Sequence, residues 1–264
     1  MGSEEAARRW NDFAEDYAEK HSELGDLHKE VLLNPVIMEL AGDIQNKKLL
    51  DAGCGEGYLS RLLAKAGATV TAVDYSEKML EIAQNRTISG AAVNYFHGSL
   101  ENLSFLEERQ FDLVISNMVL HDLQDYEKAL QQMYQVLSPG GTLIFSILHP
   151  AFITPVSSWE RTPSGEKLFW KVDRYFDEGV FEQPLGGKEK MLLFHRTLSN
   201  YVNQIVQTGF TLEQVVEPRP SDHMLEKYPS FKSDLRRPDF IVFKAVKEPL
   251  KSTLLDKEGI IGSR

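Results

Sequence analysis

The chain has 264 residues, 42% of them hydrophobic, which is enough for one large domain with a proper core. Its 29 basic and 39 acidic residues give a formal net charge of −10, a balance that repels phosphate backbones and argues against a nucleic-acid partner. The single cysteine, Cys54, excludes an intramolecular disulfide and a multi-cysteine metal site.

The first predicted elements are two helical segments. Residues 4–20 form an amphipathic helix whose apolar side chains recur at three- and four-residue spacings: Ala6, Ala7, Trp10, Phe13, Ala14 and Tyr17. A second helical pattern at about 28–41 contains Pro35, which predicts a kink or a division into two pieces. We take residues 1–45 together as an N-terminal helical lid.

Short apolar strands and helical patterns alternate from residue 46 to residue 150, the segment that we expect to bind a cofactor. Helices are predicted after the first, second and fourth strands, and Ser76 is placed to cap the second of these helices. The strands lack strict polar alternation, as expected where helices cover both faces of a sheet. The pattern predicts an α/β fold with a doubly wound, mostly parallel sheet. The predicted strands are residues 49–53, 69–74, 91–98, 111–117 and 142–150.

Residues 151–196 interrupt this rhythm with prolines, glycines and aromatic residues. Because a structureless loop of that length is unusual in a compact domain, we predict an inserted substrate cap with small strands or hairpins of its own. Residues 197–248 resume the α/β pattern, and residues 249–264 form a tail. The last two strands are joined by a longer polar loop and can close the sheet with an antiparallel edge. The predicted elements here are a helix at 197–210 and strands at 211–218 and 239–247.

The sequence DAGCGEG, residues 51–57, follows the first predicted strand. Its glycines, Gly53, Gly55 and Gly57, allow a sharp turn and let a ligand approach backbone atoms that a Cβ would screen. The dinucleotide-binding pattern needs its third glycine one place later, where Tyr58 stands, and the G-K-[ST] signature of a phosphate-binding loop is missing from this turn. The turn is therefore not typical of a diphosphate site.

Two acids flank the turn and favour a different ligand. Asp51 places negative charge beside the glycines, which disfavours phosphates and suits a cation such as S-adenosylmethionine, with its ammonium and sulfonium groups. Asp74 ends the second strand, a position from which an acid accepts ribose hydroxyls in nucleotide-binding sheets. Taken singly, the glycines are equally consistent with a plain strand-to-helix turn and Asp74 with a loop residue. Together, at this spacing, they favour cofactor binding.

The order of these motifs resembles that of the class I S-adenosylmethionine-dependent methyltransferases, over residues 10–247. The similar stretches are LLDAGCGEG, VDYS, GSLENLSF, FDLVISNMVLHDL and VLSPGGTLIFS. Within the class, the sequence is most similar to the type 11 group, which acts on small molecules. The resemblance implies S-adenosylmethionine as cofactor, a small-molecule methyl acceptor, and a seven-stranded sheet whose last strand is antiparallel.

The resemblance also implies which residues contact the cofactor. Asp51 is added to these residues by the charge argument above. Many relatives carry an aspartate where this chain has Ser99, so that contact departs from the family pattern. For Tyr17 and Met79 the alternative is core packing on helical faces, and for Asn117 a strand-end turn. The matching positions are Gly53 and Gly55 for the methionine portion, Asp74 for the ribose, Tyr75 and Met79 for the adenine faces, Ser99 and Leu100 for the adenine edge, Asn117 for the amino-acid end, and Tyr17 as a closing group.

Methyl transfer from a sulfonium is an in-line displacement, so the protein mainly aligns donor and acceptor and excludes water. A general base is needed only where the acceptor carries a proton. His121 and His149 follow the fourth and fifth strands, at the sheet edge where α/β folds bind ligands, and are the candidate catalytic residues. Tyr175 and His195 of the cap are candidate substrate residues. The alternatives are hydrogen-bonded structural histidines and a cap whose aromatic residues form only its own core.

We therefore predict a methyltransferase that uses S-adenosylmethionine and acts on a small molecule. One rival is a non-catalytic protein that binds the same cofactor; another, with less support, is an NAD(P)-dependent oxidoreductase, which Asp51 and Tyr58 disfavour. The histidines and carboxylates show no metal-ligand spacing, and no apolar run has the length of a signal-peptide core or a membrane span. We expect no metal and a cytoplasmic location. The acceptor, the atom methylated and the oligomeric state stay open.

Overall fold

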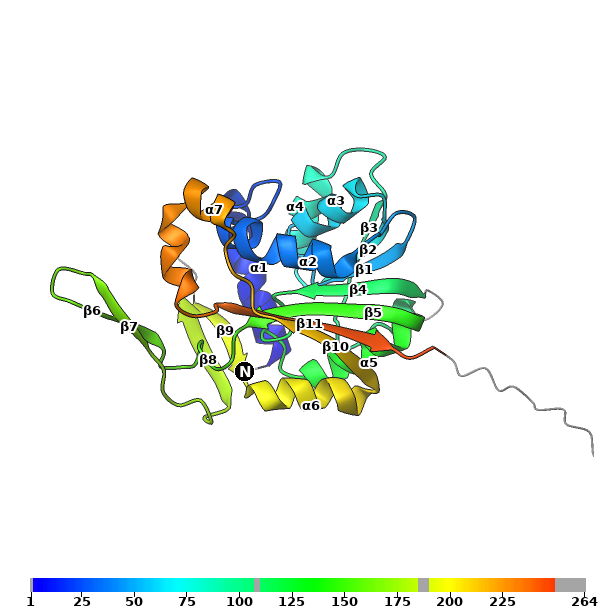
Figure 1. The fold of residues 1–264 in the computed structure, drawn as a ribbon. Helices are drawn as coiled ribbons and strands as arrows, with labels where there is room; N and C mark the ends of the chain where they lie inside the picture. The colour runs from blue at the N-terminus through cyan, green and yellow to red at the C-terminus, as the bar shows by residue number, and fades with distance from the viewer. Residues whose placement is uncertain (1, 107–109, 185–189, 250–264) are drawn as a thin grey trace, which may run out of the picture.

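The structure is a computed structural model that describes residues 2–106, 110–184 and 190–249 (Figure 1). The strands of its main sheet are β1 (Lys48–Ala52), β2 (Thr69–Asp74), β3 (Val93–His97), β4 (Phe111–Asn117), β5 (Leu137–Leu148), β10 (Phe210–Val216) and β11 (Phe240–Lys247). They form a seven-stranded sheet in the order β10-β11-β5-β4-β1-β2-β3. Strands β1 to β5 run parallel to one another, while β11 pairs antiparallel with both β5 and β10. The predicted mostly parallel sheet with an antiparallel last strand is confirmed.

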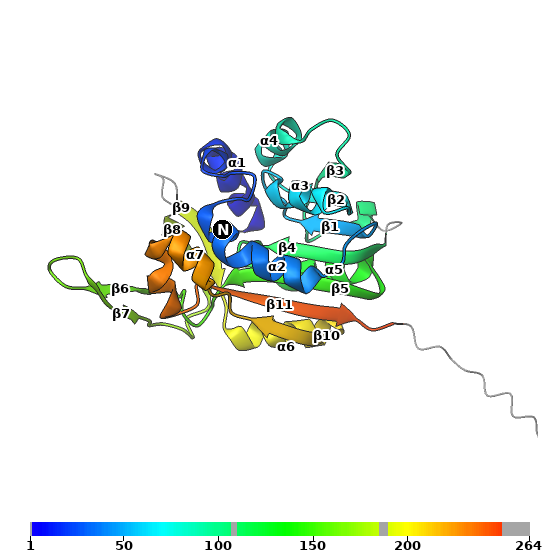
Figure 2. The same ribbon diagram turned by 45° about the horizontal axis from the view of Figure 1, so that its top comes forward.

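Helices cover both faces of this sheet (Figures 1 and 2). One face is covered by α2 (Asn34–Ala41), α3 (Tyr58–Lys65) and α4 (Glu77–Arg86), and the other by α5 (Tyr126–Val136) and α6 (Leu198–Thr208). Successive residues of β1 supply both cores, since Leu49 packs with the first group and Leu50 with the second. This two-sided burial explains the apolar strands of the sequence.

The N-terminal segment is divided as predicted. α1 (Ser3–Glu19) is followed by a π-helical segment, η1 (Lys29–Leu33), which runs directly into α2. Pro35 lies in the first turn of α2, directly after η1. The predicted helical pattern is thus divided into η1 and α2, which pack in the core on one face of the sheet, while α1 lies against α4.

The inserted cap contains the hairpins that were predicted for it. Two two-stranded sheets form, from β6 (Ser158–Arg161) with β7 (Lys167–Lys171) and from β8 (Gly179–Pro184) with β9 (Lys190–His195). The first hairpin projects from the body of the molecule (Figure 1). The second is joined to the lid, because Arg9 on α1 donates to the Lys190 carbonyl at 2.8 Å and pairs with Glu182 at 2.8 Å.

The connection between the last two strands differs from the expected polar loop. It holds α7 (Asp222–Lys227) and a 3-10 segment, η3 (Pro229–Leu235); another, η2 (Ser104–Leu106), precedes β4. Ser221 caps α7 by accepting from the Met224 amide at 3.3 Å, and Phe231 is buried in the core. The helix escapes prediction because it is short and buries no side chain of its own. From residue 250 onward the predicted tail lies outside the described residues. None of the helices in the described part of the chain combines the length and apolarity needed to cross a membrane.

Candidate functional site

A cavity of about 330 Å³ lies at the carboxyl ends of β1, β2 and β4, beneath α1. This is the edge where open α/β sheets bind ligands. Every residue that the sequence suggested for cofactor contact lines this one cavity: Tyr17, Asp51, Gly53, Gly55, Asp74, Tyr75, Met79, Ser99, Leu100 and Asn117. The residues that the sequence pattern predicts for cofactor contact therefore lie together at one place in the fold.

The glycine turn forms the floor of the cavity. Gly53 has a φ of +85°, and a Cβ added there would lie 2.4 Å from Cγ2 of Val119. Gly55 has a φ of +53°, with no atom within 4 Å of an added Cβ. Left-handed backbone at both positions is what glycine adopts without strain. The turn therefore leaves open space above Gly55 for a ligand, while Gly53 is pressed against the loop after β4.

Asp74 links the glycine turn to the start of α4. Its Oδ2 accepts from the Gly55 amide at 2.8 Å, and its Oδ1 accepts from the Ser76 amide at 2.8 Å. Ser76 in turn caps α4 by accepting from the Met79 amide at 3.2 Å, as predicted. Burial raises the pKa of Asp74, and the backbone donors oppose that shift. A carboxylate has about four acceptor sites, so Asp74 retains capacity for hydroxyl donors in the cavity.

Asp51 is a deeply buried acid of the cavity, 1% exposed. Ser60 on α3 donates to its Oδ2 at 2.5 Å. The pKa of Asp51 is raised to about 7, chiefly by burial and also by the nearby carboxylates of Asp74 and Glu56, against the effect of the Ser60 hydrogen bond. The ionised form of a buried carboxyl such as this one is stabilised when a cation lies beside it in place of the lost water.

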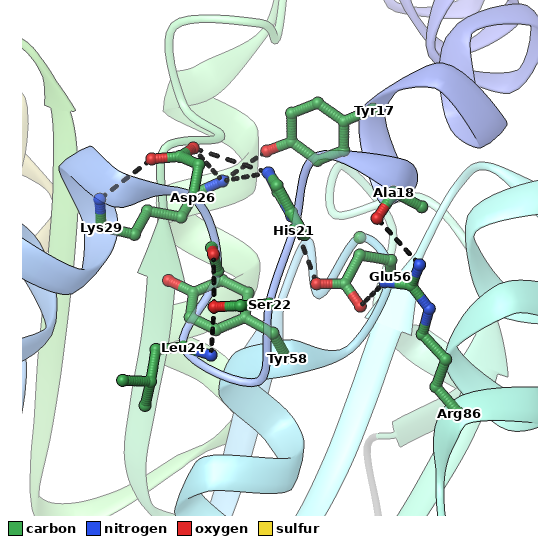
Figure 3. Close-up of polar contacts among 12 residues, drawn as sticks. Tyr17, Ala18, His21, Ser22, Leu24, Asp26, Lys29, Glu56, Tyr58 and Arg86 are labelled. Carbon is green, nitrogen blue, oxygen red and sulfur yellow. Dashed lines mark hydrogen bonds and ion pairs between the residues drawn. The ribbon is translucent and has the colours of Figure 1, made fainter.

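The far end of the cavity holds a polar cluster that joins the lid to the sheet (Figure 3). Lys29 is buried, and its Nζ donates to the Tyr17 hydroxyl at 2.5 Å and pairs with Asp26 at 3.1 Å. Burial works against the charge on Lys29, but Tyr17 and Asp26 outweigh it and raise the pKa of the amine. His21 Nδ1 lies 3.3 Å from Glu56 Oε1. A buried ammonium that faces a cavity is a natural partner for a carboxylate.

Another part of the cavity lining is more apolar. Met79 and Leu100 are buried, and the half-exposed Tyr75 ring stacks on His97 at 5.7 Å with an interplanar angle of 19°. The Ser99 hydroxyl already accepts from the Glu101 amide at 3.1 Å. Glu101 itself lines the cavity, so this edge carries an acid although position 99 does not.

Asn117, at the end of β4, is fixed by two neighbours. Its Nδ2 donates to the Tyr58 hydroxyl at 2.8 Å, and its Oδ1 accepts from Ser146 at 2.6 Å. The side chain therefore makes hydrogen bonds to neighbouring side chains and also lines the cavity, and its contact with the cofactor stays a prediction.

The candidate base and substrate residues do not line this cavity. His149 pairs with Glu217, with Nε2 and Oε1 2.9 Å apart, and burial lowers its pKa. His195 Nε2 lies 2.8 Å from the Tyr175 carbonyl oxygen. His121 and His195 line a separate space of about 20 Å³ beneath the cap. Their catalytic and substrate roles stay predictions, and this placement gives them no support.

One group of metal-ligating side chains lies outside the cavity. His28, Asp234 and Asp239 offer ligand atoms within 4.8 Å of one another. Arg237 already pairs with the Asp239 carboxylate, so a guanidinium occupies an oxygen that a metal would need. We assign no metal to this group.

The chain is similar to known proteins over most of its length. An uncharacterized protein of Haemophilus influenzae is 31% identical over 83% of this chain and 88% of its own length. A solved structure of an S-adenosylmethionine dependent methyltransferase from Mesorhizobium loti is 29% identical, covers 80% of this chain and 96% of that one, and has a TM-score of 0.70. A family model described as a methyltransferase domain matches residues 50–145.

One relative with a named activity shows the family to which this chain belongs. A ubiquinone biosynthesis O-methyltransferase of Pseudomonas entomophila is 30% identical over 78% of this chain and 93% of its own length. The chain belongs to the S-adenosylmethionine-dependent methyltransferases. Its matches agree with a class I enzyme of the type 11 group that uses S-adenosylmethionine as cofactor, not a nicotinamide dinucleotide. Some relatives align less fully, since the chain spans 57% of a Bordetella avium ubiquinone biosynthesis O-methyltransferase that is 36% identical.

The cavity of this methyltransferase has the chemistry that the cofactor requires. The space above Gly55 admits a ligand close to the backbone, the buried Asp51 suits a cation, and the buried Lys29 suits a carboxylate. These groups lie along one cavity, with apolar side chains at its other end. The residues present therefore fit the cofactor.

Proposed function

We propose that this methyltransferase transfers a methyl group from S-adenosylmethionine to a hydroxyl oxygen of a small, largely apolar molecule. The observation that carries the proposal is the convergence of all the predicted cofactor contacts on one cavity of about 330 Å³. The hydroxyl acceptor is supported by the ubiquinone biosynthesis O-methyltransferases among its relatives. The aromatic residues of the cap support an apolar acceptor.

Each part of the cofactor has a partner in this proposal. Lys29 and Tyr17 meet the methionine carboxylate, and Asp51 compensates the ammonium and sulfonium charges. Asp74 accepts from the ribose hydroxyls. Met79 and Leu100 enclose the adenine, and Tyr75, Ser99 and Glu101 lie around it. In the transfer itself, these residues bind and orient the donor, and α1 excludes water from the cavity.

Calorimetry with S-adenosylhomocysteine and with adenosine tests the binding part of the proposal. We expect both ligands to bind, and the first to bind more tightly because it also engages the polar cluster around Lys29. If the folded protein takes up neither ligand at high micromolar concentration, the proposed site is wrong.

Replacing Lys29 with methionine is expected to weaken S-adenosylhomocysteine binding by about 1.5–3 kcal/mol, the value of a hydrogen bond to a charged group. Adenosine lacks the amino-acid portion, so its affinity should stay the same within a factor of two. The adenosine titration is thus a built-in control for misfolding. Equal losses for both ligands would show that Lys29 supports the fold and not the carboxylate.

The affinity for S-adenosylhomocysteine is expected to depend on pH through Asp51. Its pKa is raised to about 7, so the carboxyl is mostly protonated at pH 6 and mostly ionised at pH 8. The ligand ammonium favours the ionised form, so the affinity should rise by about tenfold from pH 6 to pH 8 and then level off. Calorimetry in buffers of different ionisation heat should detect proton release. The Asp51→Asn variant should lose this dependence, and an unchanged pH profile in that variant would contradict the assignment.

A further inference from the structure

Glu101 is an acid of the cavity lining to which the cofactor contacts proposed above give no specific partner. It follows Leu100 directly, and Ser3, at the start of the lid helix α1, lies beside it in the lining. The Ser3 hydroxyl donates to Oε1 of Glu101, and the Asp125 amide donates to the same oxygen at 3.3 Å. These two contacts hold the carboxylate between the lid and the N-terminus of α5.

The second oxygen of this carboxylate, Oε2, is available to a ligand. Within residues 2–106, 110–184 and 190–249, both hydrogen bonds to the Glu101 side chain go to Oε1, and Oε2 has none. Glu101 is half-buried, and the unpaired polar atoms that are sealed from solvent in this part of the chain do not include Oε2. Oε2 is therefore an open acceptor with accessible surface, on a residue that lines the cavity.

The neighbouring polar groups of this lining are less suited to accept a hydrogen from a ligand. The Ser99 hydroxyl accepts from the Glu101 amide at 3.1 Å, and Oδ1 of Asn102 accepts from the Ser104 amide at 3.2 Å. Glu4 on α1 is exposed, so water competes with any ligand for its carboxylate. Glu101 thus offers this part of the cavity a carboxylate oxygen that is both partly shielded from water and unpaired among the described residues.

The adenine base of the cofactor carries a donor that matches this oxygen. Its 6-amino group donates hydrogen bonds, whereas its unsubstituted ring nitrogens accept them. An ionised carboxylate only accepts, so its partner on the edge of adenine is the amino group. Because hydrogen bonds to an ionised group are about twice as strong as neutral ones, an acid at this point distinguishes adenine from a purine that lacks the amino group.

We propose that Glu101 selects the adenine base of the cofactor, with Oε2 accepting from the 6-amino group. This role rests on the proposed function, in which Met79 and Leu100 enclose the adenine. Ser3 is the positioning residue, because its hydroxyl holds Oε1 and leaves Oε2 for the base. The chain therefore carries its base-selecting acid two residues beyond Ser99, at a point where the lid helix holds it.

Calorimetry with adenosine and with purine riboside, which lacks only the 6-amino group, tests this role. Wild type is expected to bind adenosine about 10- to 150-fold more tightly, the value of a hydrogen bond to a charged group. In Glu101→Ala the two ligands should bind within twofold of each other, while the affinity for purine riboside changes by less than threefold. Glu101→Gln keeps the length and a neutral acceptor, so its ratio should lie between these two. Glu4→Ala, which removes an exposed acid of the same lining, is the matched control and should keep the wild-type ratio.

The outcomes separate this role from the proposed function. A folded wild type that binds neither S-adenosylhomocysteine nor adenosine contradicts both. If wild type binds these two ligands but takes up purine riboside as tightly as adenosine, only the role of Glu101 is overturned. The role is also wrong if Glu101→Ala or Glu101→Gln keeps the wild-type ratio, or if Glu101→Ala loses affinity for both nucleosides equally, since Glu101 would then support only the packing of the lid.

Discussion

The Asp74→Ala variant is expected to bind S-adenosylhomocysteine about 30- to 1000-fold more weakly than wild type. The carboxylate is placed to accept from the ribose hydroxyls and also holds the amides of Gly55 and Ser76. Hydrogen bonds to a charged group contribute about 1.5–3 kcal/mol each and are not fully additive, so we expect a loss of about 2–4 kcal/mol. Calorimetry measures this loss directly.

Adenosine distinguishes this effect from that of Lys29. Because adenosine carries the ribose, Asp74→Ala should weaken it as much as S-adenosylhomocysteine, whereas Lys29→Met should spare it. Asp177→Ala, which removes an exposed acid of the cap, is the matched control and should leave both affinities unchanged. An Asp74→Ala variant that binds within twofold of wild type would remove Asp74 from the site.

The Gly53→Ala variant is expected to lose about 2–4 kcal/mol of folding stability together with cofactor binding. Alanine there has to adopt a φ of +85° with its Cβ 2.4 Å from Val119, so both backbone strain and a clash oppose it. For a chain of this size that loss lowers Tm by roughly 4–16 °C. Differential scanning calorimetry gives the value.

Gly55→Ala is the matched comparison for this variant. Its φ is +53° and an added Cβ meets no atom within 4 Å, so only the cost of left-handed backbone remains, about 1–2 kcal/mol. Its Tm should fall less than that of Gly53→Ala. The account of the turn is wrong if the two variants melt together, or if Gly53→Ala melts with wild type.

The sheet and the floor of the cavity were predictable because their signals are local. The turn from Gly53 to Gly57 follows β1 and the acid Asp74 ends β2, and the parallel pairing of these two strands brings their carboxyl ends together. The cap hairpins were predictable from proline and glycine content. α7 was not, since a short helix without buried side chains leaves no apolar period in the sequence.

The groups that distinguish this cavity depend on how the lid packs. Nothing in the sequence distinguishes Lys29 from a surface lysine. It is buried because α1 packs against the start of η1 and places Tyr17 beside it. In the same way, the sequence favours His121 as a base because histidine titrates near neutrality. The turn after β4 instead buries the imidazole beside the small space beneath the cap. Neither outcome is encoded in residue spacing.

A crystal structure of the protein with S-adenosylhomocysteine tests the central claim most directly. We expect the ligand in the cavity of about 330 Å³, with its carboxylate at Lys29, its ammonium near Asp51 and its ribose hydroxyls on Asp74. A ligand bound in the reverse direction, or at another place while this cavity stays closed by its own side chains, would contradict the account.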